Sequence, residues 1–209
     1  MAARNKLQPR VLWVEGKDDS AVVQSLCKQH DVPETFQVVD KEGIEKLLDG
    51  LPVQLRSPGL ERFGVVLDAD TDVQARWTSI RNVLLAEGYH AVPAEPAPTG
   101  TIVSAPDLPL FGAWLMPKNT EPGMLEDFAA ALVPPGDFLW TRAGEVIDAI
   151  PMEHRRFSEG HRAKAHVRTW LAWQEDPGTP MGLAITKQYL NANAPLAHSF
   201  VAWLSRLMR

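Results

Sequence analysis

The sequence contains few of the residues that build thiolate metal centres or disulfides. Cys27 is the only cysteine among 209 residues, so neither an internal disulfide nor a zinc cluster of thiolates can form within the chain. Its apolar neighbours Val22, Val23 and Leu26 predict a buried position on a helix. The six histidines include no His-Glu-x-x-His arrangement, which removes the usual signature of a zinc hydrolase.

Two nucleotide-binding signatures and any membrane span are also missing. No Gly-x-x-x-x-Gly-Lys-Ser/Thr sequence is present, which excludes a P-loop ATPase, and no Gly-x-Gly-x-x-Gly follows the first predicted strand, which argues against a dinucleotide-binding enzyme. No apolar run reaches the roughly 18 residues of a membrane span, and residues 1–6 lack the apolar segment of a secretory signal. We therefore expect a cytoplasmic protein with no membrane partner.

The length and composition favour one α/β domain with a helical extension. With 209 residues, 45% of them hydrophobic, the chain can bury a substantial core but is too short for two unrelated domains. The net charge of −5 is uneven, because residues 1–150 carry 22 acids and 13 bases whereas residues 151–209 carry 4 acids and 8 bases. A basic C-terminal part would offset the repulsion between a carboxylate-rich site and a phosphate substrate.

Apolar runs of strand length alternate with helix-like segments over the first half of the chain. This order predicts a mostly parallel, doubly wound sheet with right-handed crossovers. The predicted strands are 11–14, 36–39, 62–67 and 110–116, with a short strand at 101–103 inside the proline-rich segment 91–109. The predicted helices are 18–30, 43–55, 73–87, one that begins near Gly123 or Met124, and then 142–150, 159–174, 181–190 and 195–208.

Carboxylates follow two of the predicted strands at the point where each strand ends. Glu15 and Gly16 follow the first strand, and Asp68 and Asp70 lie at the end of the third. In a parallel sheet the carboxyl ends of the strands meet at one edge, where ligands bind, and residues i and i+2 of a strand point the same way. Because Mg²⁺ prefers oxygen ligands, we predict a divalent metal site formed by these three carboxylates.

These motifs carry a resemblance to a known domain. The sequences Val-Glu-Gly-Lys-Asp-Asp at 14–19 and Leu-Asp-Ala-Asp at 67–70 together resemble the TOPRIM domain, a metal-binding module of topoisomerases, bacterial primases, the OLD family of nucleases and a ribosomal RNA maturase. The resemblance covers residues 8–132. It implies a TOPRIM, Rossmann-like α/β fold there, and we expect residues 133–209 to form an all-helical C-terminal extension packed on it.

The resemblance also implies roles for individual residues. The position of Glu15 is that of a catalytic acid/base or a metal ligand, and the positions of Asp68 and Asp70 hold Mg²⁺ or Mn²⁺, as one or two ions. Asp72 would extend the acidic cluster without being required. Asp19 belongs to the pattern but has no assigned task.

A second segment narrows the resemblance. Residues 114–119 and 122–128 resemble a segment of small TOPRIM proteins related to the OLD nucleases, in which a Leu-Glu pair adds a metal-site carboxylate that corresponds to Glu126. The alternative, which stays open for Glu126, is that it only stabilises the first turn of a helix. For Asp127 and Asp18 we favour that helix-start interpretation.

OLD-type sites also use a lysine from a later helix, and Lys164 is the candidate. His161, Lys164 and Arg168 have the i, i+3, i+7 spacing of one helix face. Such a stripe could contact phosphates, although a solvated helix face has the same pattern.

Other members of the wider group fit less well. A topoisomerase needs a nucleophilic tyrosine on a further domain, and this chain has only Tyr89 and Tyr189. A primase would need a zinc module, which one cysteine cannot build. Since the P-loop is missing, any ATPase that works with this chain would be a separate partner.

Two hypotheses follow. In the first, the chain is a stand-alone nuclease that hydrolyses phosphodiester bonds in DNA or RNA with Mg²⁺ or Mn²⁺. Its catalytic residues would be Glu15 and Lys164, and its metal ligands Glu15, Asp68, Asp70 and Glu126. In the alternative, it is a non-catalytic TOPRIM-fold module that binds a metal, a nucleotide or a protein partner.

Overall fold

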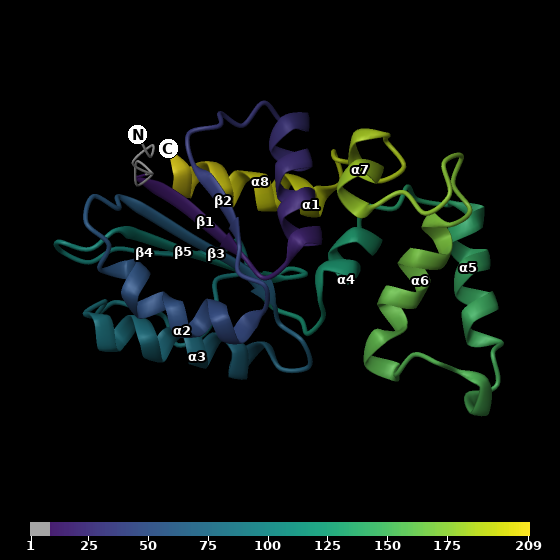
Figure 1. The fold of residues 1–209 in the computed structure, drawn as a ribbon, viewed down its shortest axis with the longest axis horizontal. Helices are drawn as coiled ribbons and strands as arrows, with labels where there is room; N and C mark the ends of the chain where they lie inside the picture. The colour runs from purple at the N-terminus through teal and green to yellow at the C-terminus, as the bar shows by residue number, and fades with distance from the viewer. Residues whose placement is uncertain (1–8) are drawn as a thin grey trace, which may run out of the picture.

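Short apolar runs of the chain form the strands of one five-stranded sheet (Figure 1). The structure is a computed structural model that describes residues 9–209. The strands are β1 Arg10–Val14, β2 Gln37–Asp40, β3 Arg62–Asp68, β4 Thr101–Val103 and β5 Leu110–Met116. Their order is β2-β1-β3-β5-β4, and neighbouring strands are parallel except that β4 runs antiparallel to β5. The expected mostly parallel α/β fold is therefore confirmed.

Helices cover both faces of this sheet. They are α1 Lys17–Gln29, α2 Ile44–Leu55, α3 Val73–Glu87, α4 Leu125–Ala130, α5 Phe138–Asp148, α6 Arg162–Leu171, α7 Met181–Thr186 and α8 Pro195–Met208, with short 3-10 turns η1 Met152–His154 and η2 Glu159–His161 before α6. Helices α2 and α3 lie on one face and α1 and α8 on the other, while α5 and α6 lie side by side beyond α4 (Figure 1). Each face has its own buried apolar cluster. Since both faces are covered, ligands reach the sheet at its edges.

The strand register brings the ends of β1, β3 and β5 to one edge. Val14 of β1 pairs with Val66 of β3, and Asp68 at the end of β3 pairs with Met116 of β5. Glu15 is the residue that follows β1. Because β1 and β3 end at the same edge, Glu15 and Asp68 both lie at the carboxyl edge of the sheet. Parallel sheets bind ligands at this edge.

Two glycines allow helix α8 to lie close against the sheet. Gly64 of β3 and Gly112 of β5 are register partners, and a Cβ on them would approach Leu207 Cδ2 to 2.8 and 2.6 Å. The indole N–H of Trp203 donates a hydrogen bond of 3.2 Å to the carbonyl of Thr101. Helix α8 therefore completes the core on this face, although it lies late in the sequence.

Of the later helices, α8 has the predicted range 195–208, whereas α5, α6 and α7 differ from their predicted ranges at the ends. Helix α5 begins at Phe138 rather than Arg142, because the Asp137 carboxylate accepts a hydrogen bond of 2.7 Å from a backbone N–H of the first turn and so caps the helix. Helices α6 and α7 are shorter than predicted. After α7, Gln188 takes a left-handed backbone conformation with φ 62°, which ends the helix.

The helices after residue 132 pack on the same sheet as the first half of the chain. The boundary between an α/β domain at 8–132 and an extension at 133–209 stays a prediction, because the helices after residue 132 share one apolar cluster with β1, β3 and β5. Gln8 and the residues 1–6 used for the secretion prediction lie outside the described part. Within residues 9–209, no helix is long and apolar enough to cross a membrane.

The contact between α8 and the sheet predicts a large packing energy for Leu207, which is fully buried. We expect Leu207→Ala to lower the free energy of unfolding by about 2 to 4 kcal/mol in urea denaturation, because the cavity lies over two glycines that cannot fill it. The control is Leu183→Ala, at a side chain that is 43% exposed, with an expected loss below about 1 kcal/mol. Equal losses in the two variants would contradict the packing role of α8.

Candidate metal centre

Seven acidic residues line one pocket at the carboxyl edge of the sheet: Asp18, Asp40, Glu42 and a group of four from different elements. Glu15 follows β1, Asp19 lies in the first turn of α1, Asp68 ends β3 and Glu126 lies in the first turn of α4. The pocket has a volume of about 590 Å³, and Lys164 of α6 also lines it. Sequence-distant acids are thus brought together by the strand ends and by two helix starts.

Asp19 is the residue of this group that the sequence left without a task. It is only 7% exposed, and its Oδ1 has no hydrogen-bond partner within the part of the chain that the structure describes. Burial, with repulsion from Glu15, raises its pKa to about 7. A buried carboxylate oxygen without a donor is costly, and a cation would compensate it. The sequence signal for this residue was its place in the Val-Glu-Gly-Lys-Asp-Asp motif at 14–19.

Asp68 is held by backbone groups on both sides. Its Oδ1 accepts a hydrogen bond of 2.9 Å from the N–H of Leu125, and its own N–H donates to Glu15 Oε2 over 3.3 Å. Burial, followed by repulsion from Asp19 and Glu15, raises the pKa of Asp68 to about 8. The hydrogen bond fixes the carboxylate but does not offset the crowding of negative charge.

Burial also raises the pKa of Glu15, although the Asp68 N–H and the charge of Arg76 act in the opposite direction. The pKa values of three neighbouring carboxyls are therefore all raised by their shared burial. The chemistry of this donor set, all carboxylate oxygens with one orphaned atom, fits a hard divalent ion such as Mg²⁺ or Mn²⁺.

Glu126 is buried and its closest charged partner is Lys164, whose Nζ lies 3.7 Å from Glu126 Oε1. The neighbouring Asp127 accepts a hydrogen bond of 2.9 Å from the Met124 N–H and so has the helix-start role favoured from the sequence. Glu126, in contrast, points to the pocket side of the same turn. Its charge thus belongs to the acidic group and not only to the helix start.

Helix α6 is joined to the α/β part by a second ion pair. Arg168 pairs with Asp18 in the first turn of α1. The predicted basic face of α6 is therefore engaged with acids at the rim of the pocket, at both Lys164 and Arg168. Asp18 therefore forms an ion pair with α6, a contact that the helix-start interpretation did not predict.

The Asp70 side chain does not line the acidic pocket that Asp68 lines. Its carboxylate pairs with Arg76 and is 51% exposed, and it lines a separate pocket of about 270 Å³ beside α3. The i, i+2 rule fails because β3 ends at Asp68 and Asp70 has a left-handed φ of 53°. Asp72 caps α3 by accepting a hydrogen bond of 2.9 Å from the Ala75 N–H. A metal-binding role for Asp70 stays a prediction.

The acidic residues line one pocket but do not converge on a single point. Among residues 9–209, no three Asp, Glu, His or Cys side chains converge as a ready-made metal-binding group. The match between pocket and ion therefore rests on the unpartnered oxygen of Asp19 and on the raised pKa values.

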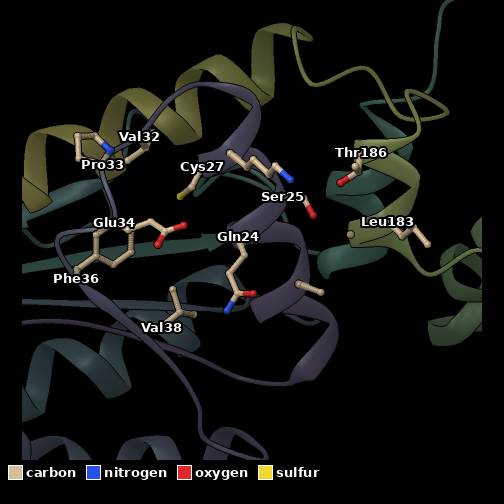
Figure 2. Close-up of a pocket in the computed structure, with 13 residues that line it drawn as sticks. Gln24, Ser25, Cys27, Val32, Pro33, Glu34, Phe36, Val38, Leu183 and Thr186 are labelled. Carbon is tan, nitrogen blue, oxygen red and sulfur yellow. The ribbon is translucent and has the colours of Figure 1, made fainter.

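A larger pocket, of about 700 Å³, has a different character (Figure 2). It lies between α1, the segment before β2, and α7, where Gln24, Cys27, Phe36 and Leu183 line it, and Glu34 is its only acid. Burial raises the pKa of the Cys27 thiol to about 11, so this cysteine is a weak nucleophile. The prediction that Cys27 is a core residue is confirmed by its burial.

Comparisons with known proteins identify the family and support the fold. Residues 9–209 match the family described as "Protein of unknown function (DUF3226)", so the chain belongs to that family. Among solved structures, the C-terminal region of the Burkholderia pseudomallei OLD protein is similar, with a TM-score of 0.50, 10% identity, and coverage of 97% of this chain and 100% of that chain. At this identity the likeness supports the fold alone. No curated protein sequence matches.

The raised pKa of Asp68 predicts how stability depends on pH. The folded protein keeps this carboxyl protonated up to about pH 8, whereas an unfolded carboxyl releases its proton near 3.8, so its contribution to stability is full below the unfolded pKa and is lost as the pH rises through 8. We expect the melting temperature of metal-free protein to fall over this range. Asp68→Asn should flatten the fall and raise the free energy of unfolding at pH of about 8.5 by roughly 1 to 2 kcal/mol.

The matched control is Asp107→Asn, at an exposed loop residue. It should keep the pH profile of the original protein in the same thermal melts. If Asp68→Asn also kept that profile, the buried carboxyl would not be the titrating group.

Proposed function

We propose that this member of the DUF3226 family hydrolyses phosphodiester bonds in DNA or RNA with Mg²⁺ or Mn²⁺ held at the acidic pocket. The observation that carries the proposal is the buried, unpartnered Oδ1 of Asp19 among Glu15, Asp68 and Glu126. The position of these acids at the carboxyl edge of the sheet supports it further. The fold shared with the C-terminal region of an OLD protein is consistent with it.

In this proposal Glu15, Asp19 and Asp68 hold one ion, and Glu126 with Asp70 would serve a second. Bound metal supplies positive charge that stabilises the attacking and leaving oxygens of the phosphate. The protein fixes Asp68 through the Leu125 N–H.

Glu15 is proposed as the acid/base of the reaction. Its carboxyl accepts the Asp68 N–H and is shielded by burial, which raises its pKa. A carboxyl with a raised pKa is closer to the protonation balance that proton transfer near neutral pH requires.

Lys164 is proposed to stabilise the phosphate in the transition state. Its ammonium is half exposed at the pocket and 3.7 Å from Glu126 Oε1, so it is paired with a residue that would also serve a metal. If Glu126 served a metal ion, the Lys164 ammonium would be free to donate to a phosphate oxygen, which is a strong charge-assisted acceptor. A separate ATPase partner is a further part of this proposal, because the sequence carries no P-loop.

The alternative is a non-catalytic module that binds a metal, a nucleotide or a protein partner at the same pocket. One observation favours it: within residues 9–209 the carboxylates do not converge into a metal-binding group, and Asp70 is engaged by Arg76. Binding of Mn²⁺ without cleavage of any nucleic acid would support this alternative.

Cleavage assays test the proposal. With Mn²⁺, the protein should cleave at least one of single-stranded DNA, duplex DNA or structured RNA. Glu15→Gln and Asp68→Asn should each lower the rate by about a hundredfold or more, because they remove the acid/base and a metal ligand. Asp107→Asn should keep the full rate. Residual nuclease activity that is equal in all four proteins would point to a contaminant and overturn the assignment.

Titration calorimetry tests the metal site without turnover. Since the metal must displace protons from Asp19 and Asp68, Mn²⁺ affinity should rise between pH of about 6 and 8.5, with a heat that depends on the buffer. Asp19→Asn should weaken binding at least about tenfold. If Asp19→Asn binds Mn²⁺ as tightly as the original protein, Asp19 does not hold the metal and the proposal loses its main support.

A further inference from the structure

Arg76 links the two aspartates of the Asp68-Ala69-Asp70 sequence. It lies in the first turn of α3, and its side chain is only 15% exposed. Its Nε donates a hydrogen bond of 2.9 Å to the Asp68 carbonyl, while its Nη2 pairs with the Asp70 carboxylate. One guanidinium is thus anchored on the backbone of one aspartate and neutralised by the side chain of the other.

The backbone around this pair is fixed, so the Asp70 side chain is the part that can move. The N–H and carbonyl of Asp70 both bond to Gly123, over 2.9 and 2.7 Å. The N–H of Arg76 donates to the carbonyl of Asp72 over 3.0 Å. The Asp70 carboxylate, by contrast, is 51% exposed, whereas its partner Arg76 is 15% exposed, so the carboxylate has room to turn away while the guanidinium stays in place.

The pair lies beside the acidic pocket and not in it: Asp70 and Arg76 line the separate pocket of about 270 Å³, and Arg76 contacts the backbone of Asp68, which lines the acidic one. The charge of Arg76 lowers the pKa of Glu15 and the charge of Asp70 raises it. A divalent cation beside Glu15 would therefore attract the Asp70 carboxylate and repel the guanidinium. The ion and Arg76 compete for the same carboxylate.

We propose that Arg76 is a further substrate-binding residue, masked by Asp70 in metal-free protein and released to bind a substrate phosphate when a divalent ion attracts the Asp70 carboxylate. This inference rests on the proposed function and adds a residue that the sequence motifs do not include. It gives the protein an order of binding in which the ion precedes the nucleic acid.

Arginine suits this role better than lysine. Its planar fork presents several N–H donors at fixed angles, so Nε can stay on the Asp68 carbonyl while the Nη donors change partner. A phosphate oxygen is an acceptor of the same charge type as the carboxylate it replaces. A lysine has one nitrogen and cannot bridge both groups in the same way.

The first experiment measures Mn²⁺ affinity by calorimetry in the absence of nucleic acid. Arg76→Gln should bind Mn²⁺ about three- to fivefold more tightly than the original protein, because the competitor for Asp70 is removed. In an Asp70→Asn background the same substitution should change the affinity less than about 1.5-fold, since the two effects are coupled. Arg81→Gln, on the same helix and bonded to the Pro93 carbonyl, controls for loss of a distant positive charge and should leave Mn²⁺ affinity unchanged.

The second experiment measures the affinity for a fluorescent phosphorothioate oligonucleotide, which resists hydrolysis, by anisotropy. At saturating Mn²⁺, Arg76→Gln should bind it about tenfold more weakly than the original protein and Arg81→Gln should not. With EDTA in place of Mn²⁺, Arg76→Gln and the original protein should bind equally, because Arg76 is then masked. Arg76→Lys should behave like Arg76→Gln in this assay, and its melting temperature checks that the fold is kept.

The outcomes separate this inference from the proposed function. Mn²⁺ binding with equal oligonucleotide affinity for Arg76→Gln and Arg81→Gln overturns the role of Arg76 and leaves the nuclease proposal standing. Tighter Mn²⁺ binding that persists in the Asp70→Asn background shows a simple charge effect and overturns the masking. If no protein binds Mn²⁺ at all, both proposals fail.

Discussion

The burial of several carboxylates at one edge of the sheet is the constraint on which the site depends. Taking like charges out of water and placing them side by side is unfavourable, and the raised pKa values of Asp19 and Asp68 express that cost. The apolar clusters on the two faces of the sheet supply the stability that keeps the acids together. This cost is the physical reason for the proposed cation site.

Basic side chains around the rim of the pocket offset part of this negative charge. Lys164 pairs with Glu126, Arg168 with Asp18 and Arg76 with Asp70. Each pair joins an acid near the pocket to α3 or α6, two helices that are also held by apolar side chains buried in the two clusters. In the proposed function these basic groups would be available to a phosphate substrate once a metal ion takes their acidic partners.

The sequence predicts the sheet and the location of the site better than the directions of the side chains. Strand periodicity and acids at strand ends locate Glu15 and Asp68, because both features are local. The direction of Asp70 depends on where β3 ends and on its pairing with Gly123, which no local pattern encodes. The burial of Asp19 depends on packing between elements that are distant in the sequence. The motif therefore pointed to Asp19, but its burial could not be predicted.

Diffraction from crystals soaked in Mn²⁺, with anomalous scattering to locate the ion, will show whether the acidic pocket is a metal site. We expect an ion bound by Asp19 and Asp68 with Glu15 beside it, and the Asp70 carboxylate turned away from Arg76. Mn²⁺ at full occupancy elsewhere, with Asp19 Oδ1 still buried and without a ligand, would rule this site out.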